Sequence, residues 1–542
     1  MQSRNIIIGL MLVGTIVALE AQMSSNRRGA ASHFQTSDRC IACHNGLTAR
    51  SGEDISIGFD WRPTMMANSA RDPYWQAGVR REILDHPQAR AAIEGECSIC
   101  HMPMARFTAH AAGREGEIFS HLPFNPARPT DRLAADGVSC ALCHRIEAAN
   151  LGKRESFIGG FVIDATLKED EWRAYGPFQV DAGRTAVMRS SSGFRPTEGT
   201  HMRQSEVCAT CHTLYTKTVT PDGFAKEEFP EQVPYQEWLH SSYNTARSCQ
   251  SCHMPAISGE APISSVLGQL HSGVERHTFL GGNFFMQRLF ARFGPELAAA
   301  AIPQDFSAAA FKTLEHLEKE SARLRIERAE FSGGHLRVMV AVENLAGHKL
   351  PTAYPSRRAW LNFTVRDRQG NVVFESGAFR SDGSIEGNDN DADGARWEPH
   401  YTEITRPDQV QIYEPIMANS AGRVTTGLLQ AVRYVKDNRL LPRGFDKQTA
   451  PVDIAVRGEA ANDADFSGGG DRVTYMVETG QARGPFHVQV KLYYQPIGYR
   501  WAHNLRSYNA FEPQRFSGYF EALAAGSGAV LAAAETTGGS PE

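Results

Sequence analysis

The ten cysteines of this 542-residue chain fall into five pairs of identical spacing, and no cysteine lies outside them. Each pair reads Cys-x-x-Cys-His. Two thiols at this spacing can add to the two vinyl groups of one porphyrin, and the adjacent histidine can supply the proximal nitrogen to its iron. We therefore expect five covalently attached c-type haems. The cofactor-binding cysteines are Cys40, Cys43, Cys97, Cys100, Cys140, Cys143, Cys208, Cys211, Cys249 and Cys252, and the proximal iron ligands are His44, His101, His144, His212 and His253.

Two other chemistries use Cys-x-x-Cys pairs. Zinc sites do so, but zinc binding does not explain a histidine at the same place five times. Redox-active disulfides do so as well, but five in one chain without a thioredoxin-like strand–helix–strand pattern would be unusual. Haem attachment is therefore the favoured interpretation.

The N-terminus predicts export. It has one arginine, an apolar run of fourteen residues from Ile6 to Leu19, and then small and polar residues. This is the layout of a secretory signal peptide over residues 1–22, with cleavage after Ala21. The run is shorter than the about 20 residues that span a bilayer comfortably, but an uncleaved anchor is the alternative. In either case we expect a periplasmic or cell-surface protein, with membrane contact only if this segment is retained.

Composition sets only broad limits. The chain is 42% hydrophobic and 22% charged, which is ordinary for a globular protein. Its formal charge of -5 is small for its size and gives no indication of nucleic-acid binding.

The close spacing of the motifs predicts how the part of the chain that carries them folds. Motif starts are 57, 43, 68 and 41 residues apart, too close for each segment to build a large core, so the porphyrins must supply buried apolar surface. We expect a pentahaem domain over residues 30–325, mostly irregular and short-helical, with two helices near its end and Ser307 capping the second.

After that region apolar residues recur at every second position, instead of at every third or fourth position as in a helix. Alternation in stretches such as "HLRVMVAVEN" and "HVQVKLYY" predicts at least six strands and an antiparallel β-sandwich over residues 330–505. The fold class is therefore α+β. The Ala- and Gly-rich tail, residues 520–542, is expected to be disordered.

With these motifs, the chain resembles the multihaem c-type cytochromes of bacterial respiration and the nitrogen cycle. The phrases "CHMP" and "HTFLGGN", and later "GHKLPT" and "RLLPRGF", add to the resemblance, the last two pointing to members with a C-terminal β domain. It implies mostly bis-histidine haems. It also implies His277 as a distal ligand, His348 in a loop reaching from the β domain to a haem, and Met66, or Met65 beside it, as a ligand of the first haem.

Other distal ligands are judged from position. His201 lies seven residues before the fourth motif, too close for its own haem, so we expect it to ligate a neighbour. His121 is a further candidate. Weaker candidates, more simply explained as surface histidines, are His86, His110, His240 and His271. Beside His348, Arg357 and Arg358 could pair with haem propionates.

The acidic stretch "GNDNDADG" suggests a second metal. Asp389, Asp391 and Asp393 alternate before Gly394 as in the opening of a calcium loop, although His400 stands where an EF-hand has an acid. A solvated acidic turn is the alternative to calcium.

These features predict an electron carrier that passes electrons between redox partner proteins outside the cytoplasm. Two alternatives remain open. The chain could be a reductase or oxidase of a small nitrogen or sulfur compound at one haem without a distal ligand, or a structural subunit of a membrane-associated cytochrome assembly.

Overall fold

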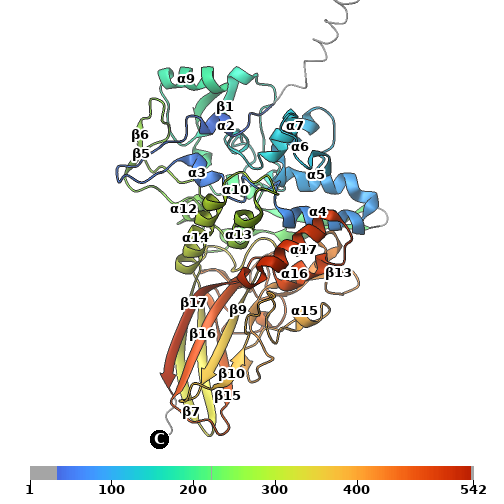
Figure 1. The fold of residues 1–542 in the computed structure, drawn as a ribbon, viewed down its shortest axis with the longest axis vertical. Helices are drawn as coiled ribbons and strands as arrows, with labels where there is room; N and C mark the ends of the chain where they lie inside the picture. The colour runs from blue at the N-terminus through green and yellow to red at the C-terminus, as the bar shows by residue number, and fades with distance from the viewer. Residues whose placement is uncertain (1–32, 221–222, 539–542) are drawn as a thin grey trace, which may run out of the picture.

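The structure is a computed structural model that describes residues 33–220 and 223–538. The expected signal peptide or anchor lies outside these residues. Within the described part, no helix is both long and apolar enough to cross a membrane. The chain mixes helices and strands: helices and loops gather at one end of the molecule and long strands at the other (Figure 1).

The helical end is built from short helices, and each attachment motif lies on or at the end of one. One helical turn brings residues three apart to the same face, so that both thiols of a pair point the same way. The helices are α2 (Asp38–Ile41), α3 (Ile57–Trp61), α4 (Pro73–Asp85), α5 (Arg90–His101), α6 (Pro103–Ala111), α7 (Pro129–Ala135), α8 (Cys140–Cys143), α9 (Ala182–Ser192), α10 (Glu206–Ala209), α11 (Pro234–Leu239) and α12 (Cys249–His253).

Small strand pairs lie between these helices, and a further pair, β13–β14, comes later in the chain. β1 (Trp172–Gly176) and β2 (Phe194–Glu198) are parallel, whereas the other pairs are antiparallel. The antiparallel pairs are β3 (Leu214–Thr220) with β4 (Gly223–Gln232), β5 (Glu260–Pro262) with β6 (Leu270–Ser272), and β13 (Pro415–Asn419) with β14 (Ala431–Asp437).

Two longer helices lead toward the strands, where helices were expected. α13 (Phe284–Phe293) buries Phe284, Phe285 and Phe290, and Phe290 stacks on Phe306 of α14 (Pro303–Glu320) at 5.1 Å. The expected cap is wrong: α14 begins at Pro303, and Ser307 lies inside it, where its hydroxyl donates to the Pro303 carbonyl at 3.0 Å.

The strand end consists of two facing sheets. One has the order β10-β9-β16-β17 with β12 on β9, and the other β11-β15-β8-β7. Phe363 of β9 stacks on Tyr475 of β15 at 3.8 Å and joins them. The strands are β7 (Ala322–Ser332), β8 (His335–Asn344), β9 (Arg358–Arg366), β10 (Val372–Ser376), β11 (Glu403–Ile404), β12 (Ile412–Tyr413), β15 (Gly470–Glu478), β16 (Phe486–Gln495) and β17 (Ala529–Gly538), with the short helix α15 (Asp389–Ala392) beside them.

Residues 520–538 of the tail that was expected to be disordered form the end of a helix and a strand, and residues 539–542 lie outside the described residues. β17 pairs antiparallel with β16 along its length. α16 (Tyr499–Leu505) and α17 (Phe511–Leu523) precede it, and α17 packs against α4, more than 400 residues earlier (Figure 1). Arg80 of α4 and Glu512 of α17 form an ion pair at 2.8 Å. α4 and α17, far apart in the sequence, therefore pack together where the helical and strand parts join.

Candidate haem-binding site

The helical end encloses a cavity of about 1100 Å³ with a mostly apolar lining. The cysteines and histidines of the first four motifs all line it, and the fifth motif borders it through Gln250 and Met254. This volume exceeds the about 300–1,000 Å³ of a site for a single drug-sized molecule. The thiols of four attachment motifs along one cavity fit several porphyrins rather than one small ligand.

The proximal histidines are oriented by hydrogen bonds from Nδ1 to backbone carbonyls. The acceptors are Ile263 for His44 at 2.5 Å, Ser69 for His101 at 3.0 Å, Tyr175 for His144 at 2.6 Å, and Leu280 for His253. Because a carbonyl can only accept, Nδ1 carries the proton and Nε2 keeps a free lone pair for iron.

Burial keeps these imidazoles uncharged. It lowers the pKa of all five proximal histidines, to about 4 for His101 and His253. An iron ligand must be unprotonated, so the burial and the hydrogen bonds agree with the role expected from the motifs.

His277 lies opposite the third proximal histidine. Its ring centre is 6.3 Å from that of His144, and the planes differ by 23°. An iron between two imidazoles, with Fe–N bonds of about 2 Å, would separate the ring centres by about 6.3 Å. Burial, and then the neighbouring His144, lower the pKa of His277 to about 3. The pair therefore has the spacing of two axial ligands.

His348 lies opposite the fifth proximal histidine in the same way. Its ring centre is 6.2 Å from that of His253, with planes 9° apart, and its Nδ1 donates to the Lys349 carbonyl at 2.8 Å. His316 of α14, which sequence reasoning missed, is also 6.3 Å from His253, but tilted by 56°. The Nδ1 bond of His348 to a backbone carbonyl, the same kind that orients the proximal histidines, favours His348 as the facing ligand.

The loop that carries His348 is fixed by buried charges. Lys349 pairs with Asp437 at 2.7 Å, and Arg439 pairs with Glu237 of α11 at 2.9 Å. Arg439 also pairs with Asp437, at 2.8 Å. Burial alone would raise the pKa of Asp437, but Arg439 and Lys349 hold it well below its ordinary value. The network joins the strand part to the helical part beside the fifth motif.

Thiols of different motifs also meet. Cys40 lies beside Cys140, Cys100 beside Cys211, and Cys208 beside Cys249. Cys143 of the third motif lies close enough to the fourth to raise the pKa of both its thiols. The first motif thus neighbours the third, and the fourth neighbours the second, third and fifth.

Two comparisons find known proteins similar to this chain. The chain is 22% identical over 194 residues to the C-type polyheme cytochrome OmcC of Geobacter sulfurreducens. That match covers 35% of this chain and 20% of the relative's own length. The fold matches the crystal structure of a penta-heme cytochrome c552 from Thermochromatium tepidum. The TM-score is 0.53 with 16% identity, and the match covers 94% of this chain and 100% of that one. No family model matches.

The chain is similar to multihaem c-type cytochromes. Its motifs, the cavity that holds their side chains and the likeness to polyheme and penta-heme cytochromes all agree.

Two predicted distal ligands, His201 and His121, lie away from the cavity lining, as His348 does. The Nε2 of His201 is 2.9 Å from the Ile146 carbonyl, to which it can only donate, so His201 is not proposed as an axial ligand. The Nδ1 of His121 contacts Asp131 at 2.8 Å, which leaves its Nε2 free, and its role as a ligand stays a prediction. Of the weaker candidates, only His271 lines the cavity, stacked on Phe178, while His110 and His240 are exposed and His86 lies outside the lining.

Met65 and Met66 both line the cavity, between α3 and α4. The Met66 carbonyl accepts from Val138 at 3.0 Å, just before the third motif. Arg357 lines the cavity as well. Arg358 does not, because it is buried against Asp391, and this corrects its expected pairing with a propionate.

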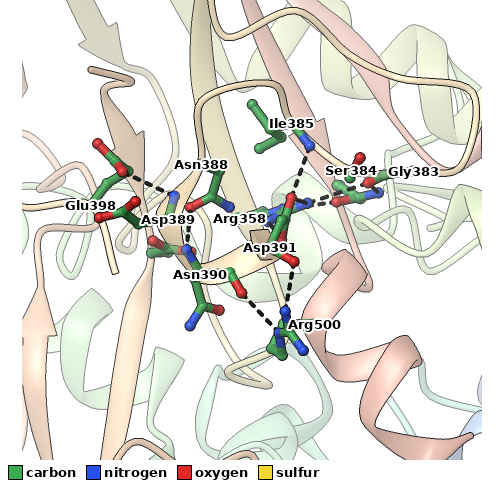
Figure 2. Close-up of polar contacts among 12 residues, drawn as sticks. Arg358, Gly383, Ser384, Ile385, Asn388, Asp389, Asn390, Asp391, Glu398 and Arg500 are labelled. Atoms are coloured by element: carbon green, nitrogen blue, oxygen red, sulfur yellow. Dashed lines mark hydrogen bonds and ion pairs between the residues drawn. The ribbon is translucent and has the colours of Figure 1, made fainter. Parts of the chain in front are cut away.

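The acidic loop does not have the arrangement of a calcium site, contrary to expectation. Asp391 receives both Arg358 nitrogens, at 2.7 and 2.9 Å, and the Ile385 amide at 2.8 Å (Figure 2). Asp389 pairs with Arg396, and Asp393 accepts from Ala395. The three carboxylates thus bond to different partners instead of converging on a cation, because the loop turns into α15.

A different cluster has metal-like spacing within the described residues, formed by His400, Asp463 and Asp471. The Nδ1 of His400 faces the amide nitrogens of Gln411 and Asn438 at 2.9 and 3.1 Å, and each amide oxygen already accepts from a backbone N–H. Nδ1 must therefore accept, and Nε2 carries the proton that it donates to Asp463 at 3.0 Å. With no lone pair left for a cation, this is a structural hydrogen-bond network.

Proposed function

We propose that this chain carries electrons between redox partner proteins outside the cytoplasm, through five haems attached at its five motifs. The observation that carries the proposal is the single cavity along which the side chains of four motifs lie, with thiols of neighbouring motifs in contact. Porphyrins attached to adjacent thiols lie close together, as electron transfer requires.

The third and fifth haems would be bis-histidine haems, held by His144 with His277 and by His253 with His348. Such closed coordination gives low-potential electron-transfer sites. Met66 remains a proposed ligand of the first haem. The haem supplies the redox chemistry, while the chain's own residues fix the axial nitrogens and exclude water from the cavity.

The contacts between motifs suggest a branched route. Electrons would pass from the first haem to the third and then to the fourth, which borders the second and fifth as well. A branched arrangement gives the carrier more than one terminus at which a partner can dock.

Rapid reduction tests the proposal. The fully oxidised holoprotein is mixed with less than one equivalent of reductant, and the haem absorbance and paramagnetic signals are followed in time. We expect the electron to distribute over all five haems before a second molecule of protein is met, at rates independent of protein concentration. A haem whose reduction rate rises with protein concentration would receive its electrons from other molecules, and this would contradict an internal route.

A further inference from the structure

The fourth proximal histidine is held differently from the other four. Within the described part of the chain, His212 is the one proximal histidine whose Nδ1 makes no hydrogen bond to a backbone carbonyl. Such a hydrogen bond makes an imidazole a stronger electron donor to its iron. Without it, His212 donates less, and the ferrous state of its haem is favoured.

A positive charge lies on the cavity wall beside His212. It is that of Arg357, which lines the cavity and, after burial itself, is the cause that lowers the pKa of His212. The Nη1 of Arg357 donates to the Thr352 carbonyl at 3.0 Å, and its Nη2 donates to the side-chain oxygen of Asn283 at 3.1 Å. These two bonds hold the guanidinium in place, and its remaining N–H groups have no partner among the described residues.

Arg357 also has no carboxylate partner within residues 33–220 and 223–538, and in this it differs from the cations nearby. Arg358, the next residue, pairs with Asp391 at 2.7 Å. Lys349, beside the fifth motif, pairs with Asp437 at 2.7 Å. A paired charge is largely cancelled, whereas the charge of Arg357 acts on its surroundings in the apolar cavity. A cation there favours a haem that has gained an electron.

One loop of the strand part therefore serves two motifs. It carries His348, which faces the fifth proximal histidine, and it ends in Arg357 beside the fourth. The buried Glu237 of α11 fixes the loop between them, because it accepts from the hydroxyl of Thr352, and the carbonyl of the same residue holds Arg357. The strand part thus supplies a ligand at one haem and a charge at the next.

We propose that Arg357 raises the reduction potential of the fourth haem above those of the bis-histidine third and fifth haems, so that electrons collect there. The inference rests on the proposed function, because the haem attached at Cys208 and Cys211 would supply the iron. The free N–H groups of Arg357 suit a propionate carboxylate, whose negative charge would otherwise oppose reduction.

The fourth haem has the position of a junction, since its motif borders the second, third and fifth. In a transfer from the third haem, one electron leaves the third iron, which becomes ferric, and reduces the fourth iron to the ferrous state, while no bond forms or breaks. A junction at a higher potential than its neighbours would hold the electron until a partner withdraws it from either branch.

Redox titration of the holoprotein tests the inference. The protein is poised at a series of potentials, and haem absorbance and electron paramagnetic resonance are recorded at each. His277→Ala and His348→Ala identify the third and fifth haems, because each variant should turn one haem high-spin. We expect a further haem, the one that responds to Arg357, to be reduced before both of them in the parent protein.

Variants of the arginine assign the effect. Arg357→Gln removes the charge and should lower the potential of that haem, changing its redox equilibrium constant about tenfold, or about 59 mV for one electron. Arg357→Lys keeps the charge and should give a smaller shift. Arg184→Gln is the matched control: Arg184 lines the cavity too but pairs with Asp181, and its replacement should leave the potential unchanged. An intact mass with five haems shows that each variant is assembled.

Three results would overturn the inference: equal potentials in Arg357→Gln and the parent protein, a shift confined to the haem that His348→Ala turns high-spin, or a responding haem that is reduced after the third and fifth. Each of them leaves the electron-carrier proposal standing if electrons still distribute over five haems at rates independent of protein concentration. Rates that rise with protein concentration would instead contradict the carrier, whatever the potentials.

Discussion

At the scale of single residues, the hydrogen bond made by one ring nitrogen of a histidine decides whether the other nitrogen can bind iron. Four proximal histidines, and His348 as well, donate from Nδ1 to a backbone carbonyl and keep Nε2 free for iron. His201 instead donates from Nε2 to the Ile146 carbonyl, and His400 donates from Nε2 to Asp463. A sequence shows that a histidine is present but not which nitrogen is engaged, which is why His201 was a plausible candidate before the structure.

Replacing His348 with alanine tests the fifth haem directly. With its facing imidazole removed, one low-spin haem should become high-spin in the electron paramagnetic resonance spectrum. His316→Ala is the matched control, since His316 lies at nearly the same distance from His253 but is tilted, and it should leave that haem low-spin. A high-spin haem in His316→Ala but not in His348→Ala would identify His316 as the iron ligand. Low-spin haems in both variants would mean that neither histidine binds iron.

The pKa of Glu231 predicts a pH dependence of stability. Its ordinary value is 4.5, and in the folded protein it rises to about 8. Between these values the unfolded chain releases the proton while the folded chain keeps it, so the free energy of unfolding falls as pH rises. Glu231→Gln should therefore gain stability over the parent protein from about pH 4.5 to 8, on the order of a few kcal/mol.

Denaturant unfolding of the holoproteins across this pH range measures the effect. The exposed neighbour Glu227, changed to glutamine, is the control and should give a curve parallel to that of the parent protein. A Glu231→Gln curve that is parallel too would mean that Glu231 ionises at its ordinary pH.

At the scale of elements, the apolar periodicity of the sequence predicts which helices and strands form better than its capping residues predict where they begin. The three- and four-residue apolar steps predicted α13 and α14, and the alternation predicted β8, β9 and β16. The start of α14 was misplaced because Pro303, with no N–H to donate, begins the helix four residues before the expected cap. β17 was missed because "AVLAAAE" is rich in alanine, a poor strand former, and it is the pairing with β16 that makes it a strand.

The buried charges around the His348 loop predict a large stability effect. Asp437→Asn leaves Lys349 and Arg439 without their shared carboxylate in a buried site, which should lower the free energy of unfolding by about 3 kcal/mol or more. Asp408→Asn breaks an exposed pair with Arg406 and should cost less than about 1 kcal/mol. Denaturant titration at neutral pH measures both. Equal effects would mean that the buried network does not hold the loop.

The acidic loop predicts insensitivity to calcium removal. Because Arg358 already neutralises Asp391, a calcium chelator should leave the melting temperature unchanged, whereas Asp391→Asn should cost about 3 kcal/mol. Asp393→Asn, in the same loop but exposed, should have little effect. A melting temperature that falls with chelator and recovers with added calcium would restore the calcium loop expected from the sequence.

At the scale of the whole molecule, the motifs reveal the cofactor, but only the fold reveals how the motifs meet. The spacing of the cysteines predicted haem attachment without any structure. Which motifs are neighbours depends on chain segments far apart, such as Cys40 beside Cys140 and His253 beside His348. No local pattern encodes these contacts, because they arise when the chain wraps one shared cavity and the strand part closes its end.

The central claim is that all five motifs carry a covalent haem, and the mass of the intact, denatured protein tests it most directly. Denaturation removes any cofactor that is not covalently bound. The mass should then exceed that of the polypeptide by five haems, and changing both Cys97 and Cys100 to alanine should reduce the excess to four. A mass with fewer than five haems on the unaltered chain would contradict the claim.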